Sequence, residues 1–267
     1  MIDSRSQALS RKLDELPHHQ ALLDGTDWAS LATPYGTGAP LPAMLTRLLD
    51  PDPAVRAAAA TDAFDEVTHQ NTIYEATVPV ALYVAAILNH SSTAAGELAP
   101  YTGPPPRRPT RARLLDWLET TAHDADDQSF ATHARICGVG FLCEYRPMHA
   151  FRDMRPAIFS AVQPSLDHDH REVRDAALVA AIPLAEHPAF TTYRAELADH
   201  ARRLLATSTD RSRRGRVLDA LAAWGHDISG VETTNDMAAR ELRNRLADPD
   251  DWWANNGTDA CSEAPPF

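Results

Sequence analysis

One segment of this chain occurs twice, and this repetition constrains the fold more than any other feature of the sequence. The first copy, Leu48 to Phe64, reads LLDPDPAVRAAAATDAF, and the second, Leu166 to Ile182, reads LDHDHREVRDAALVAAI. Each copy ends one apolar element, turns through paired aspartates and starts a helix with Val-Arg. The Val-Arg pairs lie 118 residues apart, close to three periods of about 40, the lower end of the spacing in one class of α-helical repeats. The sequence therefore predicts a helical repeat array.

The turn in the first copy carries the residues that begin a helix. Asp50 and Asp52 flank Pro51, and Pro53 fits the first helical turn, where a missing N–H costs nothing. Apolar residues then recur at every fourth position, which favours one buried helix face. This stripe consists of Val55, Ala59, Ala63 and Val67.

The turn in the second copy contains Asp167-His168-Asp169-His170, with one extra residue expected before Val173. Two imidazoles and two carboxylates are good zinc ligands, but adjacent side chains in a turn diverge. The first copy has aspartates in the matching places without any histidine. Capping by the aspartates is therefore the favoured interpretation, and we predict no metal site.

Composition agrees with a helical protein. Only 11 of the 267 residues are glycine, 44% are hydrophobic and 23% are charged, which suits a helical globular chain better than a turn-rich β-sandwich. We expect an all-α fold.

At the repeated residues the sequence resembles HEAT-repeat proteins, specifically the short actinobacterial kind. The pattern of that family, an Asp-bearing turn and a second helix that opens with Val-Arg, is matched by Asp50, Val55 and Arg56 and by Asp167, Val173 and Arg174. The segments 27–49 and 69–88 also look like the N-terminal half of that group. The resemblance implies an αα-superhelix (solenoid) of about five or six helix pairs with a concave binding surface. It implies no catalytic residue.

The chain is expected to divide at a proline-rich segment. We interpret residues 1–99 as an N-terminal HEAT-like half, 100–110 as a proline-rich loop or hinge, 111–247 as a C-terminal HEAT-like half and 248–267 as an acidic tail. In the C-terminal half, helices are expected at 131–145, 156–162, 193–205, 216–224 and 237–246.

Charge and cysteine content limit the class of protein. The net charge of -12 disfavours general attraction to nucleic acid or anionic lipid. No apolar stretch has the length of a signal peptide or a membrane span, so we expect a cytoplasmic protein without a membrane partner. Cys137, Cys143 and Cys261 are expected to be free thiols, with Cys137 buried beside His133 on one helix.

Catalytic and cofactor motifs are not found in the sequence. It has no Gly-x-Ser-x-Gly elbow, no dinucleotide fingerprint and no Walker sequence. We therefore predict no catalytic residue and no cofactor, and the sequence favours a protein that is not an enzyme.

Aromatic and polar residues gather in two segments of the N-terminal half. Trp and Tyr are favoured at the centres of interfaces, so these residues are candidates for partner binding. The interpretation that we favour is that they close the first hydrophobic face of the array, with partner binding as the alternative. The candidates are Trp28, Tyr35, His69, Gln70, Tyr74 and Glu75, with Asn71 beside them.

Arginines form two clusters, one of which lies at 107–113. Arginine binds phosphate bidentately, so the second cluster is the candidate phosphate-binding set of an alternative interpretation. Its members are Arg202, Arg203, Arg211, Arg213, Arg214 and Arg216. Ion pairing with neighbouring carboxylates is the interpretation that we favour for these arginines.

Two functional hypotheses follow. The first is a non-enzymatic scaffold that binds another protein, with a basic surface, through its concave face; an immunity or regulatory protein is one form of it. The alternative is a HEAT-like DNA-binding protein or a DNA glycosylase-type enzyme that uses the arginine clusters.

Overall fold

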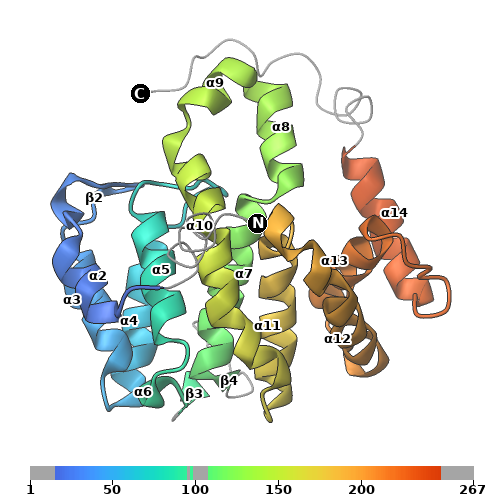
Figure 1. The fold of residues 1–267 in the computed structure, drawn as a ribbon, viewed down its shortest axis with the longest axis horizontal. Coiled ribbons are helices and arrows are strands. Elements are labelled where there is room, and N and C mark those ends of the chain that lie inside the picture. Colours follow the sequence, from blue (N-terminus) through green and yellow to red (C-terminus); the bar gives the residue numbers. More distant parts are fainter. Residues whose placement is uncertain (1–15, 95–96, 99–107, 248–267) are drawn as a thin grey trace, which may run out of the picture. The chain divides into compact units, whose positions relative to one another are not determined.

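The computed structural model describes residues 16–94, 97–98 and 108–247 (Figure 1). Most of these residues are helical, which confirms the expected all-α class. The chain forms two compact units, the first ending at His200 and the second beginning at Ala201.

The first unit contains most of the helices. Those before the proline-rich segment are α2 (His19–Gly25), α3 (Leu41–Thr46), α4 (Pro53–Asp65), α5 (Thr77–Ile87) and α6 (Ser91–Ala94). Those after it are α7 (Thr110–Asp124), α8 (Asp127–Cys137), α9 (Val139–Glu144), α10 (Arg146–Val162) and α11 (Arg171–Leu184). Short 3₁₀ helices are η1 (Trp28–Ser30), η2 (Arg47–Leu49), η3 (Gln163–Asp167) and η4 (Pro188–Tyr193).

Within the part of the second unit that the structure describes, three helices lie in the unit or lead into it. These are α12 (Arg194–Thr207), α13 (Arg211–Ala223) and α14 (Thr234–Ala247). They confirm the helices expected at 193–205, 216–224 and 237–246 to within a few residues at each end.

Two small antiparallel pairs of strands accompany the helices. β1 (Ala32–Thr33) pairs with β2 (Gly36–Thr37), and β3 (Glu97–Leu98) pairs with β4 (Arg108–Pro109). The expected loop at 100–110 lies mostly outside the described residues. Its last residue, Thr110, is already the first residue of α7.

The helix start expected in the first copy of the repeat is confirmed. Pro53 is the first residue of α4, and the Asp52 carboxylate accepts a hydrogen bond from the backbone N–H of Ala54 at 2.8 Å. Ala59 and Ala63 are fully buried, so the predicted stripe faces the core.

The helix start in the second copy differs from the expectation. The imidazole Nδ1 of His168 accepts from the His170 N–H at 3.0 Å, and the Nδ1 of His170 accepts from the Glu172 N–H at 3.2 Å. In the first copy, Asp50 and Asp52 make the same two contacts. The histidines therefore occupy the aspartate places, and the expected extra residue and the capping by Asp167 and Asp169 were wrong.

The arginine of each Val-Arg pair folds back over its own turn. Arg56 Nη1 donates to the carbonyl oxygens of Asp50 at 2.6 Å and Pro51 at 3.1 Å. Arg174 Nη1 donates in the same way to the carbonyls of His168 and Asp169, both at 2.7 Å. The two copies thus share one register, and a turn held by an arginine explains why Val-Arg recurs.

The core of the first unit lies among helices that run side by side. Helix α11 packs on α7 and α10, and α5 packs on α10, α2 and α7 (Figure 1). Along α11, every residue from Val173 to Leu184 except Arg174 is buried. Apolar burial of this extent is the main stabilising contribution to such a fold.

The single helix expected at 131–145 is two helices. Gly138 has φ +85°, which separates α8 from α9. A residue with a side chain rarely adopts that conformation, so glycine permits the break. Helix α8 buries none of its residues, and Cys137 is exposed, so the expectation that Cys137 is buried was wrong.

Within the described residues, no helix is both long enough and apolar enough to cross a membrane.

Candidate functional site

Trp28 lies inside the first unit rather than on its surface. Its side chain is buried, with 5% of the residue exposed, and its indole N–H donates to the carbonyl of Leu23 at 3.0 Å. Of the predicted partner-binding residues, Trp28 therefore packs with the core and fixes the segment that leads into β1.

Tyr35 projects from the turn between β1 and β2. It is 66% exposed, and its ring meets that of His69 edge to face, with the centroids 6.4 Å apart. The Glu75 carboxylate accepts from the backbone N–H of Ala32 at 3.0 Å, and Glu66 accepts from the Thr33 hydroxyl at 3.0 Å. These contacts hold the hairpin against the segment between α4 and α5, and they bring Tyr35, His69 and Glu75 together.

Gln70 and Asn71 form a tight turn beside Tyr35. Their φ angles are 48° and 57°, and the Thr72 N–H donates to the His69 carbonyl at 3.0 Å. Two successive residues with positive φ make a type I′ turn. Glutamine rarely adopts this conformation, so the surrounding structure must hold it.

Tyr145, just before α10, supplies that support. Its hydroxyl donates to the Ile73 carbonyl at 2.9 Å and accepts from the Ile73 N–H at 2.8 Å. Burial raises the pKa of Tyr145 to about 12, with smaller contributions from Tyr74 and Asp124. The phenol is therefore neutral over the physiological range and able to make both bonds. The sequence gives no signal for this contact.

Apolar side chains extend this surface onto α8 and α9. The Phe141 ring lies 5.5 Å from that of Tyr145, and the His133 ring lies 6.2 Å from it on the α8 side. Phe141 is 48% exposed, and Ile136, one turn beyond His133, is 74% exposed. We call this set the Tyr145 surface: Tyr35, His69, Gln70, Tyr74, Glu75, His133, Ile136, Phe141 and Tyr145.

Sequence reasoning missed Ile136, Phe141 and Tyr145. All three lie around the break at Gly138, where a continuous helix was expected. A continuous helix would have placed Phe141 and Ile136 on different faces, so the sequence pattern did not join them to Tyr35.

The candidate phosphate-binding arginines in the second unit differ in their surroundings. Arg202, Arg203 and Arg211 are exposed, Arg213 and Arg216 are half-buried, and Arg214 is buried. Arg213 lies 3.9 Å from the Asp210 carboxylate, and Arg202 lies 3.3 Å from the His226 ring.

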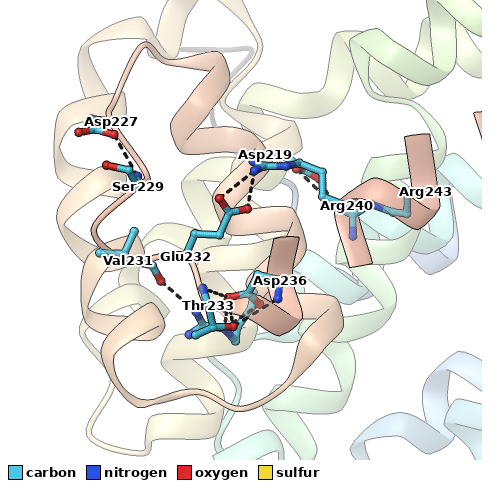
Figure 2. Close-up of polar contacts among 10 residues, drawn as sticks. Asp219, Asp227, Ser229, Val231, Glu232, Thr233, Asp236, Arg240 and Arg243 are labelled. Carbon is cyan, nitrogen blue, oxygen red and sulfur yellow. Dashed lines mark hydrogen bonds and ion pairs between the residues drawn. The ribbon is translucent and has the colours of Figure 1, made fainter. Parts of the chain in front are cut away.

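Arg214 is the centre of a buried polar network. Its guanidinium donates through Nη2 to Asp236 at 2.6 Å and to the Val231 carbonyl at 3.1 Å, and through Nη1 to the Leu205 carbonyl at 2.6 Å. Figure 2 shows Asp236 beside Thr233, whose backbone N–H and hydroxyl also donate to it. Arg214 holds the Asp236 pKa well below its usual range. This guanidinium is engaged inside the protein and does not face a ligand.

Two further ion pairs in Figure 2 involve more exposed arginines. Arg240 donates to Glu232 at 2.7 Å, and Arg243 donates to Asp219 at 3.1 Å. These pairs connect α14 to α13 and to the segment before α14.

A second polar cluster holds the start of α8. Arg155 Nη1 lies 3.5 Å from both the Asp127 and Glu186 carboxylates, and the Asp127 N–H donates to Glu186 at 2.7 Å. Burial, with further contributions from Asp127 and Asp126, raises the pKa of Glu186 to about 7. Arg155, Asp127 and Glu186 are thus paired with one another, and these contacts attach the start of α8 to α10 and to the segment after α11.

Two further features bear on chemistry. Within the described part of the chain, no three histidine, cysteine or acidic residues are grouped so as to hold a metal ion. A groove of about 330 Å³ lies between α5 and α10, lined mainly by small residues together with His18 and His19.

Comparisons of this chain with models of protein families, with curated proteins and with solved structures find no match.

Proposed function

We propose that this chain is a non-enzymatic helical-repeat scaffold of HEAT-like architecture that binds another protein through the Tyr145 surface. The observation that carries the proposal is that the Tyr145 hydroxyl, bonded to Ile73, ties the segment that bears Tyr35 and His69 to the exposed ring of Phe141. Large apolar and aromatic side chains that gather on a surface mark interaction sites more often than scattered ones.

The anchoring of this surface supports a binding role. Ile73, which follows the strained turn at Gln70 and Asn71, makes two backbone hydrogen bonds to the Tyr145 hydroxyl. Glu66 and Glu75 fix the Tyr35 hairpin. Side chains held in place before a partner arrives lose less entropy on binding. Strain that the fold maintains at an exposed turn is also more frequent at functional positions.

The repeated turn supports the HEAT-like part of the proposal. Arg56 and Arg174 make equivalent contacts at equivalent places in two helix starts. A helical unit repeated with one register is the basis of an αα-superhelix, and such arrays act mainly as binding surfaces.

Charge favours a partner with a basic surface. The whole chain carries a net charge of -12, and Glu75 and Glu144 are exposed at or beside the Tyr145 surface. Complementary charge speeds encounter and rejects acidic partners. Inhibition or regulation of a basic protein, as by an immunity protein, is the form of this function that we favour.

We do not extend the proposal to nucleic acid. Arg214 is engaged by Asp236 and backbone carbonyls, so the arginine cluster has fewer cations for phosphate than its sequence suggests. The net charge opposes the same interaction.

The experiment is affinity capture from host lysate treated with nuclease, using three forms of the chain. The first is wild type, the second is Tyr35→Ala/Phe141→Ser, and the third is the matched control Met237→Ser/Leu242→Ser, which removes exposed apolar side chains from the second unit. We expect a stoichiometric protein that wild type and control retain and the first variant loses. Equal retention by all three forms would contradict the proposal. Recovery of nucleic acid alone in a parallel capture from lysate without nuclease would contradict it as well.

A further inference from the structure

Histidine rings accept backbone hydrogen bonds at several helix starts among the described residues. In each case the imidazole Nδ1 accepts a hydrogen bond from the backbone N–H two residues later. The described residues contain five such contacts: His18 with Gln20 at 3.3 Å, His90 with Ser92 at 3.2 Å, His168 with His170 at 3.0 Å, His170 with Glu172 at 3.2 Å and His187 with Ala189 at 3.3 Å.

These contacts require neutral histidine. A backbone N–H can only donate, so the Nδ1 that faces it must carry no proton, and the ring hydrogen must lie on Nε2. Protonation of the ring turns Nδ1 into a donor and places two N–H groups against each other. A histidine ring therefore cannot carry a proton on Nδ1 and make this contact at the same time. An aspartate carboxylate at ordinary pH carries no proton and can always accept the backbone N–H.

Two of the contacts stand in tandem at the turn between η3 and α11. His168 and His170 there occupy the places that Asp50 and Asp52 occupy before α4. One molecule thus contains the same turn in two chemical versions, one built from imidazoles and one from carboxylates.

We propose that the turn between η3 and α11 is a proton-sensitive joint, which opens on acidification because a proton on Nδ1 of His168 or His170 ends the contact of that ring with the backbone N–H groups that begin α11. The equivalent turn before α4 makes the same two contacts through carboxylate oxygens, which have no ring nitrogen to protonate. The joint is independent of the proposed binding surface.

The charged groups around the joint oppose a proton on His168. Burial lowers the pKa of His168, and Arg111 of α7 lowers it further, followed by smaller effects of His170 and Arg174, while Asp169 acts in the opposite direction. Two further charged pairs lie near the joint. Asp167 lies 3.9 Å from His200 of α12, and Arg171 lies 3.5 Å from Asp175.

The direction of the effect follows from that lowered pKa. The folded chain binds the His168 proton less readily than the unfolded chain does. The stability that neutral His168 contributes is therefore complete above its ordinary pKa of 6.5 and is lost as the pH falls below it. The start of α11 matters for the rest of the first unit because α11 packs on both α7 and α10.

A second group of histidines follows the same chemistry. The ring of His19 lies 4.1 Å from His18 and 5.6 Å from His90, which precede α2 and α6. Burial lowers the pKa of His19, and so do His18 and His90. His18 and His90 each accept a backbone N–H as His168 does, so the experiment must separate this group from the joint.

Hydrogen exchange of the wild-type protein, read at single residues, distinguishes the joint from the group of His18, His19 and His90. The protection factors of the His170 and Glu172 amides, corrected for intrinsic exchange, are compared at pH 8 and pH 5.5 with those of Asp52 and Ala54. We expect at least a fivefold loss of protection at His170 and Glu172 on acidification and less than a twofold change at Asp52 and Ala54. Equal changes at both turns would overturn the proposal.

Substitutions that swap the side chains of the two turns give an independent test. The variant His168→Asp/His170→Asp installs the residues of the first turn, and Asp50→His/Asp52→His is the reciprocal control. We expect the first variant to keep its α11 protection at pH 5.5 and the second to lose protection at Ala54. If His168→Asp/His170→Asp still loses α11 protection on acidification, the histidines are not the cause and the proposal is wrong.

Discussion

The hydroxyl of Tyr145 makes two hydrogen bonds to the backbone of one residue, Ile73, which lies 72 positions earlier in the chain. It accepts from the Ile73 N–H and donates to the Ile73 carbonyl, as a neighbouring β-strand would. A single side chain thereby joins the strained turn at Gln70 and Asn71 to the start of α10, and so organises the surface that we propose for partner binding.

Removing that hydroxyl should loosen the turn. Tyr145→Phe leaves the Ile73 N–H and carbonyl without their partner, and Ile73 is buried. Leaving buried polar groups unpaired costs about 1–3 kcal/mol, and urea unfolding measures this loss. Tyr193→Phe, in a ring that packs on Phe159 and Phe190, is the matched control. Equal, small effects of the two substitutions would show that the Tyr145 hydroxyl contributes nothing.

The Arg214–Asp236 pair should be essential to the second unit. Arg214→Met leaves the buried Asp236 carboxylate with only the Thr233 donors. Breaking a buried ion pair from one side costs about 3–5 kcal/mol. We expect loss of amide protection along α13 and α14, measured by hydrogen exchange. The exposed Arg211→Met is the control, and similar protection in both variants would contradict the structural role of Arg214.

Glu186 should make the protein less stable as the pH rises. Its pKa in the fold is about 7, above the ordinary 4.5, so the folded chain holds this proton more tightly than the unfolded chain. The contribution is therefore present below pH 4.5 and is lost as the pH rises toward 7. We expect Glu186→Gln to raise the melting temperature relative to wild type more at pH 8 than at pH 5. The exposed Glu196→Gln should show no such trend, and a constant difference for Glu186→Gln would reject the assignment.

The two copies of the repeat should respond unequally to a buried charge. Val173 is buried in α11, whereas Val55 in α4 is only half-buried. An unpaired carboxylate inside the core is strongly destabilising. We therefore expect Val173→Asp to lower the melting temperature by many degrees and Val55→Asp to lower it less. The reverse order, or no change in either variant, would contradict the register of the repeat.

The sequence was informative where local chemistry decides the structure. The Asp52 cap, Pro53 at the first position of α4 and the buried alanine stripe follow from spacing alone, because each depends on residues close in the chain. The helical class follows from the same kind of pattern.

The sequence was misleading where the structure depends on contacts between distant residues or on a single backbone angle. The positive φ of Gly138 breaks a helix whose apolar pattern continues, and the Tyr145 contact joins residues that no local pattern relates. At the second turn, acidic residues suggested aspartate caps, whereas the neighbouring histidines have the correct register to accept the same hydrogen bonds. Part of the candidate surface, Tyr35 with His69 and Glu75, could be predicted, but its extension to Phe141 and Ile136 could not.

Photo-crosslinking tests the proposed binding surface most directly. A photoreactive phenylalanine analogue is placed at position 35, at position 141 or, as a control, at position 242, where Leu242 is 51% exposed in the second unit. The account predicts that positions 35 and 141 crosslink to the same protein and that position 242 does not. A partner that remains bound in all three forms but crosslinks only at position 242, or equally at all three positions, would contradict it.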